Sequence, residues 1–358
     1  METNTAPESF RPDENLDILP HVISLGDNGE LFSDGTFAKY RVDLEKDIID
    51  SFREITKDWP TKRLVIYAHG GLVSAEGAFK DIRPDLQTLK QNYCYPLAIV
   101  WRTGPIETVI SEIKDDFGRD RGGAMGTPKQ GLREVKDRII EFIVRNTKIQ
   151  DLWRQMKDNA RLAAEQDHGG SRIACQIVSK LIQENPSLEI HLVSHSAGSI
   201  LQGYFLDYLT GSTQEGKLGL RVASCSHWAP ACTLDFFRDT YLPLISNGTI
   251  SRYSIMTLND RAEREDECKA GLISIYDKSL LYLVSRGFEK NLAKSDEGGI
   301  PLLGMELFLN QAGDLTEILQ NAWTKTPSAL IPKCKHHGSF SEDKDVLQAT
   351  IKFITQSE

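Results

Sequence analysis

The sequence lacks three features that would place a protein in or beyond a membrane. It has no apolar run of about 20 residues, the length that a helix needs to cross a bilayer. Its opening segment, METNTAPESFRPDEN, is polar and acidic and lacks the basic-then-apolar order of a signal peptide. None of the 6 cysteines is spaced as CxxC. We therefore expect a cytoplasmic protein with free thiols and no stable membrane insertion.

The sequence also lacks an excess of positive charge. Its 42 Lys and Arg residues are outnumbered by 51 Asp and Glu residues, for a formal net charge of -9. A nucleic-acid-binding surface needs a basic excess to meet phosphates, so we expect no nucleic-acid partner. The glycine-rich stretch GGAMGTPKQG, residues 122–131, lacks the Gly-Lys-Ser/Thr order of a phosphate loop, and no nucleotide or other cofactor is expected.

What is present is an ordinary globular composition over 358 residues, 40% hydrophobic and 26% charged. We interpret residues 1–20 as a flexible tail and 21–358 as one domain. Short apolar strands alternate with helical patterns, which is typical of a mostly parallel sheet with helices on both faces. A hairpin is expected at Asn28-Gly29, and a helical, cap-like insertion over about residues 104–168.

The periodicity of apolar residues predicts the following elements. Strands are expected at 63–71, 95–101, 189–194, 219–225, 249–258 and 305–309, and helices at 42–59, 75–91, 132–164, 171–184, 198–209, 233–242, 261–290 and 345–354. In a parallel sheet, ligands gather at the carboxyl ends of the strands, so these ends are where chemistry is sought.

The strand EIHLV runs into the segment SHSAG, residues 194–198, and then directly into a helix. A nucleophile on such a tight turn stands exposed at the top of the sheet, beside the positive end of the helix. The turn needs small residues two positions before and after the nucleophile. Centring on Ser196 places Ser194 and Gly198 there, whereas centring on Ser194 places the bulky Leu192. Ser196 is therefore the candidate nucleophile, and a helix-capping serine is the structural alternative.

Two other strand ends carry residues that would complete such a site. Tyr67–Gly71, YAHGG, follows an earlier strand, and its glycines let amide N–H groups approach an oxyanion. His336 and His337 lie between the last strand and the closing helix, the place of a general base. A metal site with Cys334 is not expected, because zinc needs about four ligands.

Of the residues that such a site needs, the carboxylate that would orient the histidine is the least determined. Asp260 is the first acid after the strand at 249–258, Asp235 follows the preceding strand, and Glu263 is a third choice. Other acids of the run 263–267 are expected to form a solvated helix face. Trp101, at the end of a strand, is expected either to line a substrate pocket or to pack in the core.

In this order of strands and motifs, from His21 onward, the chain resembles the α/β-hydrolase family. The resemblance is carried by HGG at 69–71, by SHSAG at 194–198 and by His337-Gly338. It is nearest to a poorly characterised group of hydrolases with an HHGSF-like end and the helix KSLLYLVS, here 278–285. Ser194 departs from the family, which usually has Gly at that position.

The resemblance implies an α/β-hydrolase fold in which Ser196 is the nucleophile, His337 the base and Asp260 the acid. It also implies an oxyanion hole made by the backbone N–H groups of Gly71 and Ala197. The expected activity is hydrolysis of a small-molecule acyl ester, lipid or otherwise, with residues 104–168 as a lid. A catalytically silent binding or signalling module, and a peptidase or thioesterase with the same triad, remain alternatives; the oligomeric state stays open.

Overall fold

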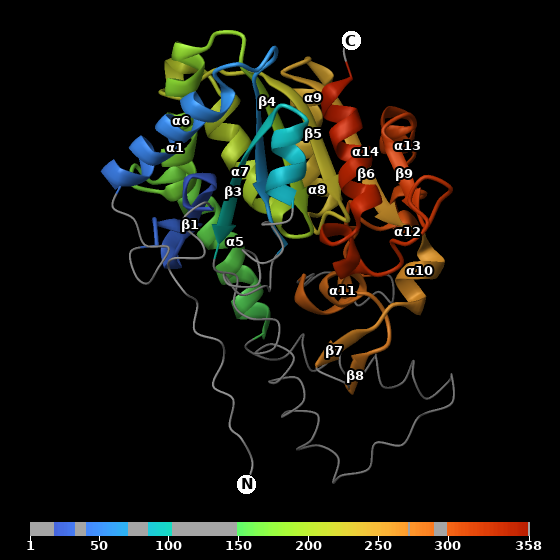
Figure 1. Ribbon diagram of the computed structural model, residues 1–358. Helices are drawn as coiled ribbons and strands as arrows, with labels where there is room; N and C mark the ends of the chain where they lie inside the picture. The colour runs from blue at the N-terminus through green and yellow to red at the C-terminus, as the bar shows by residue number, and fades with distance from the viewer. Residues whose placement is uncertain are drawn as a thin grey trace, which may run out of the picture.

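A computed structural model describes residues 18–32, 41–70, 85–101, 149–270, 273–289 and 299–356. At its centre is a sheet of seven parallel strands in the order β1-β3-β2-β4-β5-β6-β9 (Figure 1). The strands are β1 (Val22–Leu25), β2 (Arg63–Ala68), β3 (Cys94–Trp101), β4 (Glu189–His195), β5 (Val222–Trp228), β6 (Ile250–Leu258) and β9 (Trp323–Thr326). The expected parallel sheet is confirmed.

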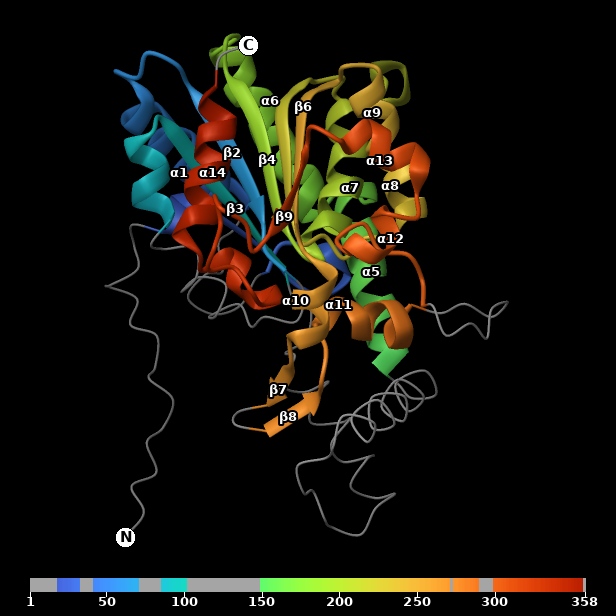
Figure 2. The same ribbon diagram turned by 90° about the vertical axis from the view of Figure 1, so that its right-hand side faces the viewer.

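Helices cover both faces of this sheet, so the side chains of its central strands are buried on both faces. The helices are α1 (Arg41–Thr56), α5 (Ile149–Glu165), α6 (Gly170–Glu184), α7 (Gly198–Thr210), α8 (Leu234–Thr240), α9 (Leu242–Ser246), α10 (Asp260–Glu265), α11 (Leu280–Leu283), α12 (Glu306–Leu309), α13 (Gly313–Leu319) and α14 (Lys344–Thr355). Figure 2 shows α14 and the helical residues 85–91 on one side, and α7, α8 and α9 on the other.

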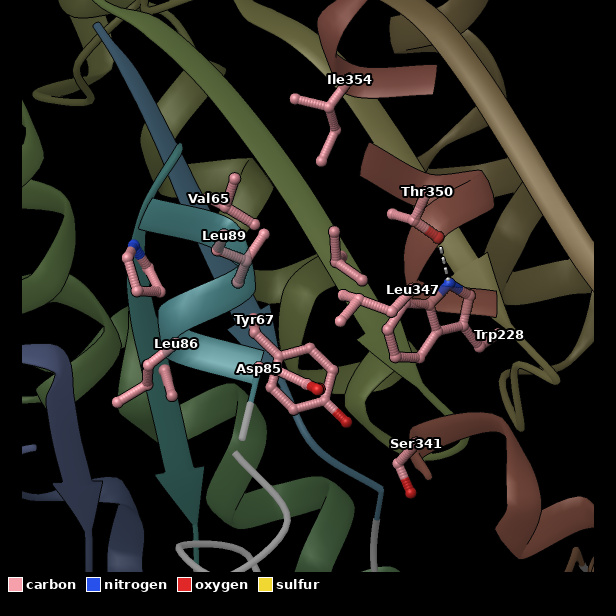
Figure 3. A pocket seen from close by; sticks show the side chains of 13 residues that line it. Val65, Tyr67, Asp85, Leu86, Leu89, Trp228, Ser341, Leu347, Thr350 and Ile354 are labelled. Carbon is pink, nitrogen blue, oxygen red and sulfur yellow. Dashed lines mark hydrogen bonds between the residues drawn. The ribbon is translucent and has the colours of Figure 1, made fainter. Parts of the chain in front are cut away.

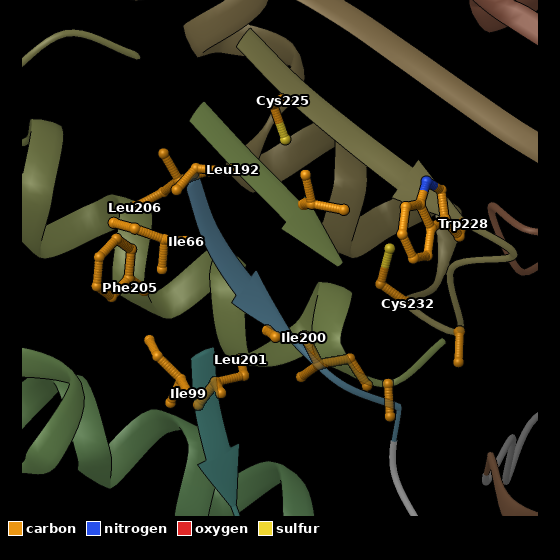
Figure 4. Close-up of a cluster of buried hydrophobic side chains, with 14 of the residues drawn as sticks. Ile66, Ile99, Leu192, Ile200, Leu201, Phe205, Leu206, Cys225, Trp228 and Cys232 are labelled. Atoms are coloured by element: carbon orange, nitrogen blue, oxygen red, sulfur yellow. The ribbon is translucent and has the colours of Figure 1, made fainter. Parts of the chain in front are cut away.

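Side chains that alternate along each strand form two apolar layers. Ile66 and Leu192 point toward α7, where they meet Leu201 and Phe205, all fully buried (Figure 4). This packing fixes α7 against the sheet, and α7 begins at the carboxyl end of β4. None of the helices in the described ranges is long and apolar enough to cross a membrane. The six cysteines all lie in the described ranges, are buried and form no disulfide with one another, as expected.

Two predicted elements near the C-terminal half are wrong. Residues 261–290 do not form one long helix: α10 ends at Glu265, and an antiparallel ribbon of β7 (Cys268–Ala270) and β8 (Ile273–Tyr276) precedes α11 and a π-helical turn, Val284–Phe288. The predicted strand at 305–309 is the helical turn α12, because so short an apolar run fits either structure. The last strand is instead the half-polar β9, at the sheet edge.

The N-terminal and insertion predictions also need correction. Asn28 and Gly29 do form a turn with positive φ, but β1 pairs in parallel with β3. The returning chain meets β1 only at an isolated antiparallel bridge, Leu25 to Leu31, within the described residues. Of the predicted insertion, α5 packs its apolar side against α7 and belongs to the main body. Residues 104–148, with the glycine-rich loop and its expected hinges, lie outside the described ranges.

Candidate active site at the carboxyl end of β4

Ser196 lies on the turn between β4 and α7 and has a φ of 52°. A serine in this left-handed region costs energy, so the surrounding contacts must hold it there. Its N–H donates to the Trp228 carbonyl at 2.9 Å, and its own carbonyl accepts from the N–H of Ala231 at 2.9 Å. The strained turn therefore holds Ser196 where the strand has ended and the helix has not yet begun.

Gly198, the first residue of α7, makes this turn sterically possible. A Cβ added at this position would lie 2.2 Å from the Ala68 carbonyl oxygen and 2.7 Å from that of His69. No ordinary side chain fits within these distances, so glycine lets α7 start directly against the end of β2. Gly198 thus fulfils the requirement for small residues on which the choice of Ser196 depended.

Ser194 is a strand residue with its side chain enclosed. It pairs with Ala68 of β2 and His227 of β5, and it is 0% exposed. Among the described residues, its Oγ has no hydrogen-bond partner. Ser194 therefore has neither a base nor access to a substrate, whereas Ser196 has a histidine beside it.

That histidine is His337, in the short helix His337–Ser341 that follows β9. Its Nε2 lies 2.9 Å from Ser196 Oγ. Burial, and to a smaller extent the nearby His195, lowers the pKa of His337 well below its ordinary value. The imidazole is therefore neutral near pH 7, and a neutral Nε2 can accept the Ser196 proton. Its neighbour His336 is mostly exposed and does not contact Ser196.

The expected acid is not brought to this imidazole. The Asp260 carboxylate accepts from the Tyr282 hydroxyl at 2.7 Å and from Arg264 at 2.8 Å. Asp235 is an exposed carboxylate that pairs with Arg238 on α8. Among the described residues, the Nδ1 of His337 has no hydrogen-bond partner at all. The structure thus joins Ser196 and His337 and leaves both Asp260 and Asp235 outside the pair.

The acidic run at 263–267 is not simply a solvated helix face, since Glu263 and Asp266 are buried. Burial raises the pKa of Glu263 to about 8, although Ser279 Oγ donates to its Oε2. Its Oε1 has no partner among the described residues. Asp266 contacts the loop that carries His336 and His337, which we call the base loop. Its Oδ2 accepts from the His337 main-chain N–H at 2.8 Å, and its Oδ1 lies 3.0 Å from His336 Nδ1.

Sequence reasoning missed Asp266 because a run of charges ordinarily faces solvent. The spacing of three between Glu263 and Asp266, directly after a strand end, was the only signal available. It places the two carboxylates on one side of the short helix α10 and its end.

The oxyanion side of the site is described in part. Gly71 lies outside the described residues. A Cβ added at Gly70 would lie 3.2 Å from Ser196 Cβ, so the loop after β2 does approach the serine. The Ala197 N–H, at the start of α7, makes no hydrogen bond to another described residue. A free amide next to the serine is what an oxyanion donor requires.

Trp101 is buried, 2% exposed, and contacts His69 in the loop after β2 rather than an open pocket. Its indole N–H donates to the His69 carbonyl at 3.2 Å, and its main-chain N–H donates to His69 Nε2 at 3.1 Å. These bonds assign the hydrogen of the neutral His69 ring to Nδ1, which donates to the Gly70 carbonyl. The described structure therefore favours the packed-core alternative for Trp101, and its expected contact with substrate stays a prediction.

An apolar pocket lies on the sheet face between α14 and residues 85–91 (Figure 3). Its walls include Tyr67, Leu86, Trp228 and Leu347, and Ser341 lies at the end nearest the strand termini. Neither Ser196 nor His337 lines it, so this pocket is not where the chemistry of the pair would take place.

Comparisons with models of protein families, with curated proteins and with solved structures found no match.

Proposed function

We propose that this chain is a serine hydrolase that cleaves carboxylic esters of small-molecule acyl substrates through an acyl-enzyme. The observation that carries the proposal is the 2.9 Å approach of His337 Nε2 to Ser196 Oγ on a strained strand-to-helix turn. A nucleophile and a base within hydrogen-bond reach, with strain at the nucleophile, are features of covalent acyl transfer. The position of this pair, at the carboxyl edge of a parallel sheet, agrees with the resemblance to α/β-hydrolases.

The reaction would proceed in two halves. As Ser196 Oγ attacks the carbonyl carbon, its proton passes to His337 Nε2, and the oxyanion forms beside the Ala197 N–H. His337 then gives the proton to the leaving alcohol, and the acyl group remains on Ser196. Water, deprotonated by His337, attacks this ester; the acid is released and Ser196 recovers its proton. Gly71, in the loop after β2, is proposed as the second oxyanion donor.

The test is covalent labelling with a fluorophosphonate probe, which reacts with activated serines. We expect one labelled residue, Ser196, identified by peptide mass, and no labelling of the Ser196→Ala variant. A panel of p-nitrophenyl esters of increasing chain length would then define the acyl preference. A folded wild-type protein that is not labelled and hydrolyses no ester would favour the non-catalytic binding module instead. We also propose a cytoplasmic location, which the absence of disulfides among the six buried cysteines supports.

A further inference from the structure

The main chain of His337 is held from both sides by buried side chains. Its N–H donates to Asp266 Oδ2 at 2.8 Å, and its carbonyl lies 3.0 Å from His195 Nε2. Asp266 is 6% exposed and His195 is 7% exposed, so neither bond is weakened by competing water. We call Asp266 and His195 the main-chain clamp. These two bonds fix the peptide groups on both sides of the imidazole.

Asp266 binds two consecutive residues of the base loop. Its second oxygen, Oδ1, lies 3.0 Å from the Nδ1 of His336, while Oδ2 holds the N–H of His337. Asp266 is the first residue after α10, which ends at Glu265. One carboxylate with two separate attachments restrains rotation of the loop more than a single bond would. Asp266 therefore fixes the position of the base loop at His336 and His337.

His195 directly precedes Ser196 and links the nucleophile turn to the base loop. A carbonyl oxygen only accepts, so the bond to His337 places the His195 hydrogen on Nε2. Burial lowers the pKa of His195 to about 4, which keeps the ring neutral. Its ring also packs against that of His337, with centroids 5.1 Å apart, and against Phe340 at 6.2 Å.

The imidazole itself has no such support. In the neutral base, Nδ1 carries the hydrogen, and no described residue accepts it. The carboxylate expected there, Asp260, is held by Tyr282 and Arg264. Among the described residues, the hydrogen bonds that hold His337, apart from its contact with Ser196, therefore reach its main chain rather than its ring.

We propose that Asp266 and His195 are positioning residues that hold His337 against Ser196 through its main chain, in place of a carboxylate bound to the imidazole. The proposal presupposes the hydrolase activity inferred above. It predicts that the chemical step depends on two residues whose hydrogen bonds to His337 reach only its main chain.

The experiment measures kcat and KM for a p-nitrophenyl ester, the rate of Ser196 labelling by a fluorophosphonate, and the urea midpoint of each variant. We expect Asp266→Ala and His195→Phe each to lower kcat by on the order of 10²-fold with little change in KM, because a displaced base impairs only the chemical step. His195→Phe keeps the packed ring and removes the donor. Asp266→Asn, which keeps one oxygen for the His337 N–H, should recover most of the loss. The matched control is Glu265→Ala, an exposed carboxylate one residue away that pairs with Arg261.

A second arm separates positioning from general damage to the fold. In a His337→Ala background there is no base to position, so adding Asp266→Ala or His195→Phe should cause no further loss of residual labelling. The clamp is overturned if Asp266→Ala and His195→Phe each lower kcat by less than about tenfold. It is also overturned if these substitutions slow labelling as much in the His337→Ala background as in the wild type. A larger loss from Asp260→Asn or Glu263→Gln than from Asp266→Ala also overturns it, because the ring would then have its own acid. A wild-type protein that is unreactive at Ser196 overturns the proposed activity and the clamp together.

Discussion

His337 Nε2 lies 2.9 Å from Ser196 Oγ, although the two residues are 141 positions apart in the sequence. Their meeting follows from the parallel sheet, because β4 and β9 both end at the same edge and each is followed at once by a loop. The two strands are not neighbours: β5 and β6 lie between them. The base loop therefore has to cross this edge to reach the serine, and the contact depends on how that loop is held.

The first prediction separates the two serines of the turn. Ser196→Ala should lower ester hydrolysis by about 10⁴–10⁶-fold, the order measured when a catalytic serine is removed. Ser194→Ala should retain most of the activity, because its hydroxyl is buried and bonds to none of the residues that the structure describes. Steady-state rates of the two purified variants decide this. Loss of activity in Ser194→Ala alone, at unchanged stability, would show that the motif is centred on the wrong serine.

The second prediction separates the two histidines of the base loop. His337→Ala should reduce activity about as much as Ser196→Ala, since residues that act as a unit are not additive. His336→Ala should cost far less, because the His336 ring is mostly exposed and bonds the second oxygen of Asp266 rather than Ser196. Labelling rates with a fluorophosphonate provide the comparison. Equal losses from both variants would contradict the assignment of His337 as the base.

Much of this arrangement could be predicted from the sequence, for reasons visible in particular residues. The tight turn at Ser196 is predictable because strand periodicity before it, helix periodicity after it and the small residues 194 and 198 all indicate it. The parallel sheet is predictable because its strands carry short apolar runs, such as those of β3 and β4, that alternate with helical patterns. These signals depend on residues that are close in the sequence, and the folded structure keeps the strand, turn and helix that they indicate.

Which carboxylate approaches His337 could not be predicted, because this depends on side-chain directions after β6. Asp260 stands first in the sequence, yet at the start of α10 its carboxylate turns toward Tyr282 and Arg264. Asp266 reaches the base loop only because α10 ends at Glu265. The edge strand β9 was missed for a related reason: Trp323–Thr326 is short and partly polar, and it becomes a strand by pairing with β6.

The third prediction concerns the pH dependence of catalysis. Burial lowers the pKa of His337, so the free enzyme keeps a neutral base well into the acid range. The acid limb of kcat/KM should therefore have its midpoint below about 6.5, the ordinary histidine pKa. Rates across the acid range, corrected for any unfolding, test this. A midpoint above that value would mean that another charge stabilises the imidazolium.

The fourth prediction concerns stability in acid. Burial lowers the pKa of His227 to about 3, so this ring stays neutral in the folded protein while it is protonated in the unfolded chain. The stability linked to it is fully present above about pH 6.5 and is lost as the pH falls toward 3, at up to about 1.4 kcal/mol per pH unit. His227→Phe should flatten the decline in the free energy of unfolding between about pH 6.5 and about pH 5.

Tyr253→Phe is the control for this pH effect. It removes the hydroxyl bonded at 2.8 Å to His227 Nδ1 and leaves the imidazole in place. This variant should be less stable at every pH but keep the wild-type slope. Urea titrations at several pH values give the slopes, and an unchanged slope in His227→Phe would contradict the prediction.

The last prediction concerns Gly198, the glycine that lets α7 begin directly after the turn. Gly198→Ala adds a Cβ 2.2 Å from the Ala68 carbonyl oxygen, and backbone cannot yield as a side-chain end can. We expect a loss of about 1–3 kcal/mol in the free energy of unfolding from this overpacking. Labelling of Ser196 should fall as well, because displacing the start of α7 moves Ser196 and the Ala197 amide together. The control is Gly313→Ala in α13, where an added Cβ meets nothing within 4 Å and helix propensity favours alanine. If Gly198→Ala is as stable and as reactive as Gly313→Ala, the tight contact between α7 and β2 does not set the geometry of the turn.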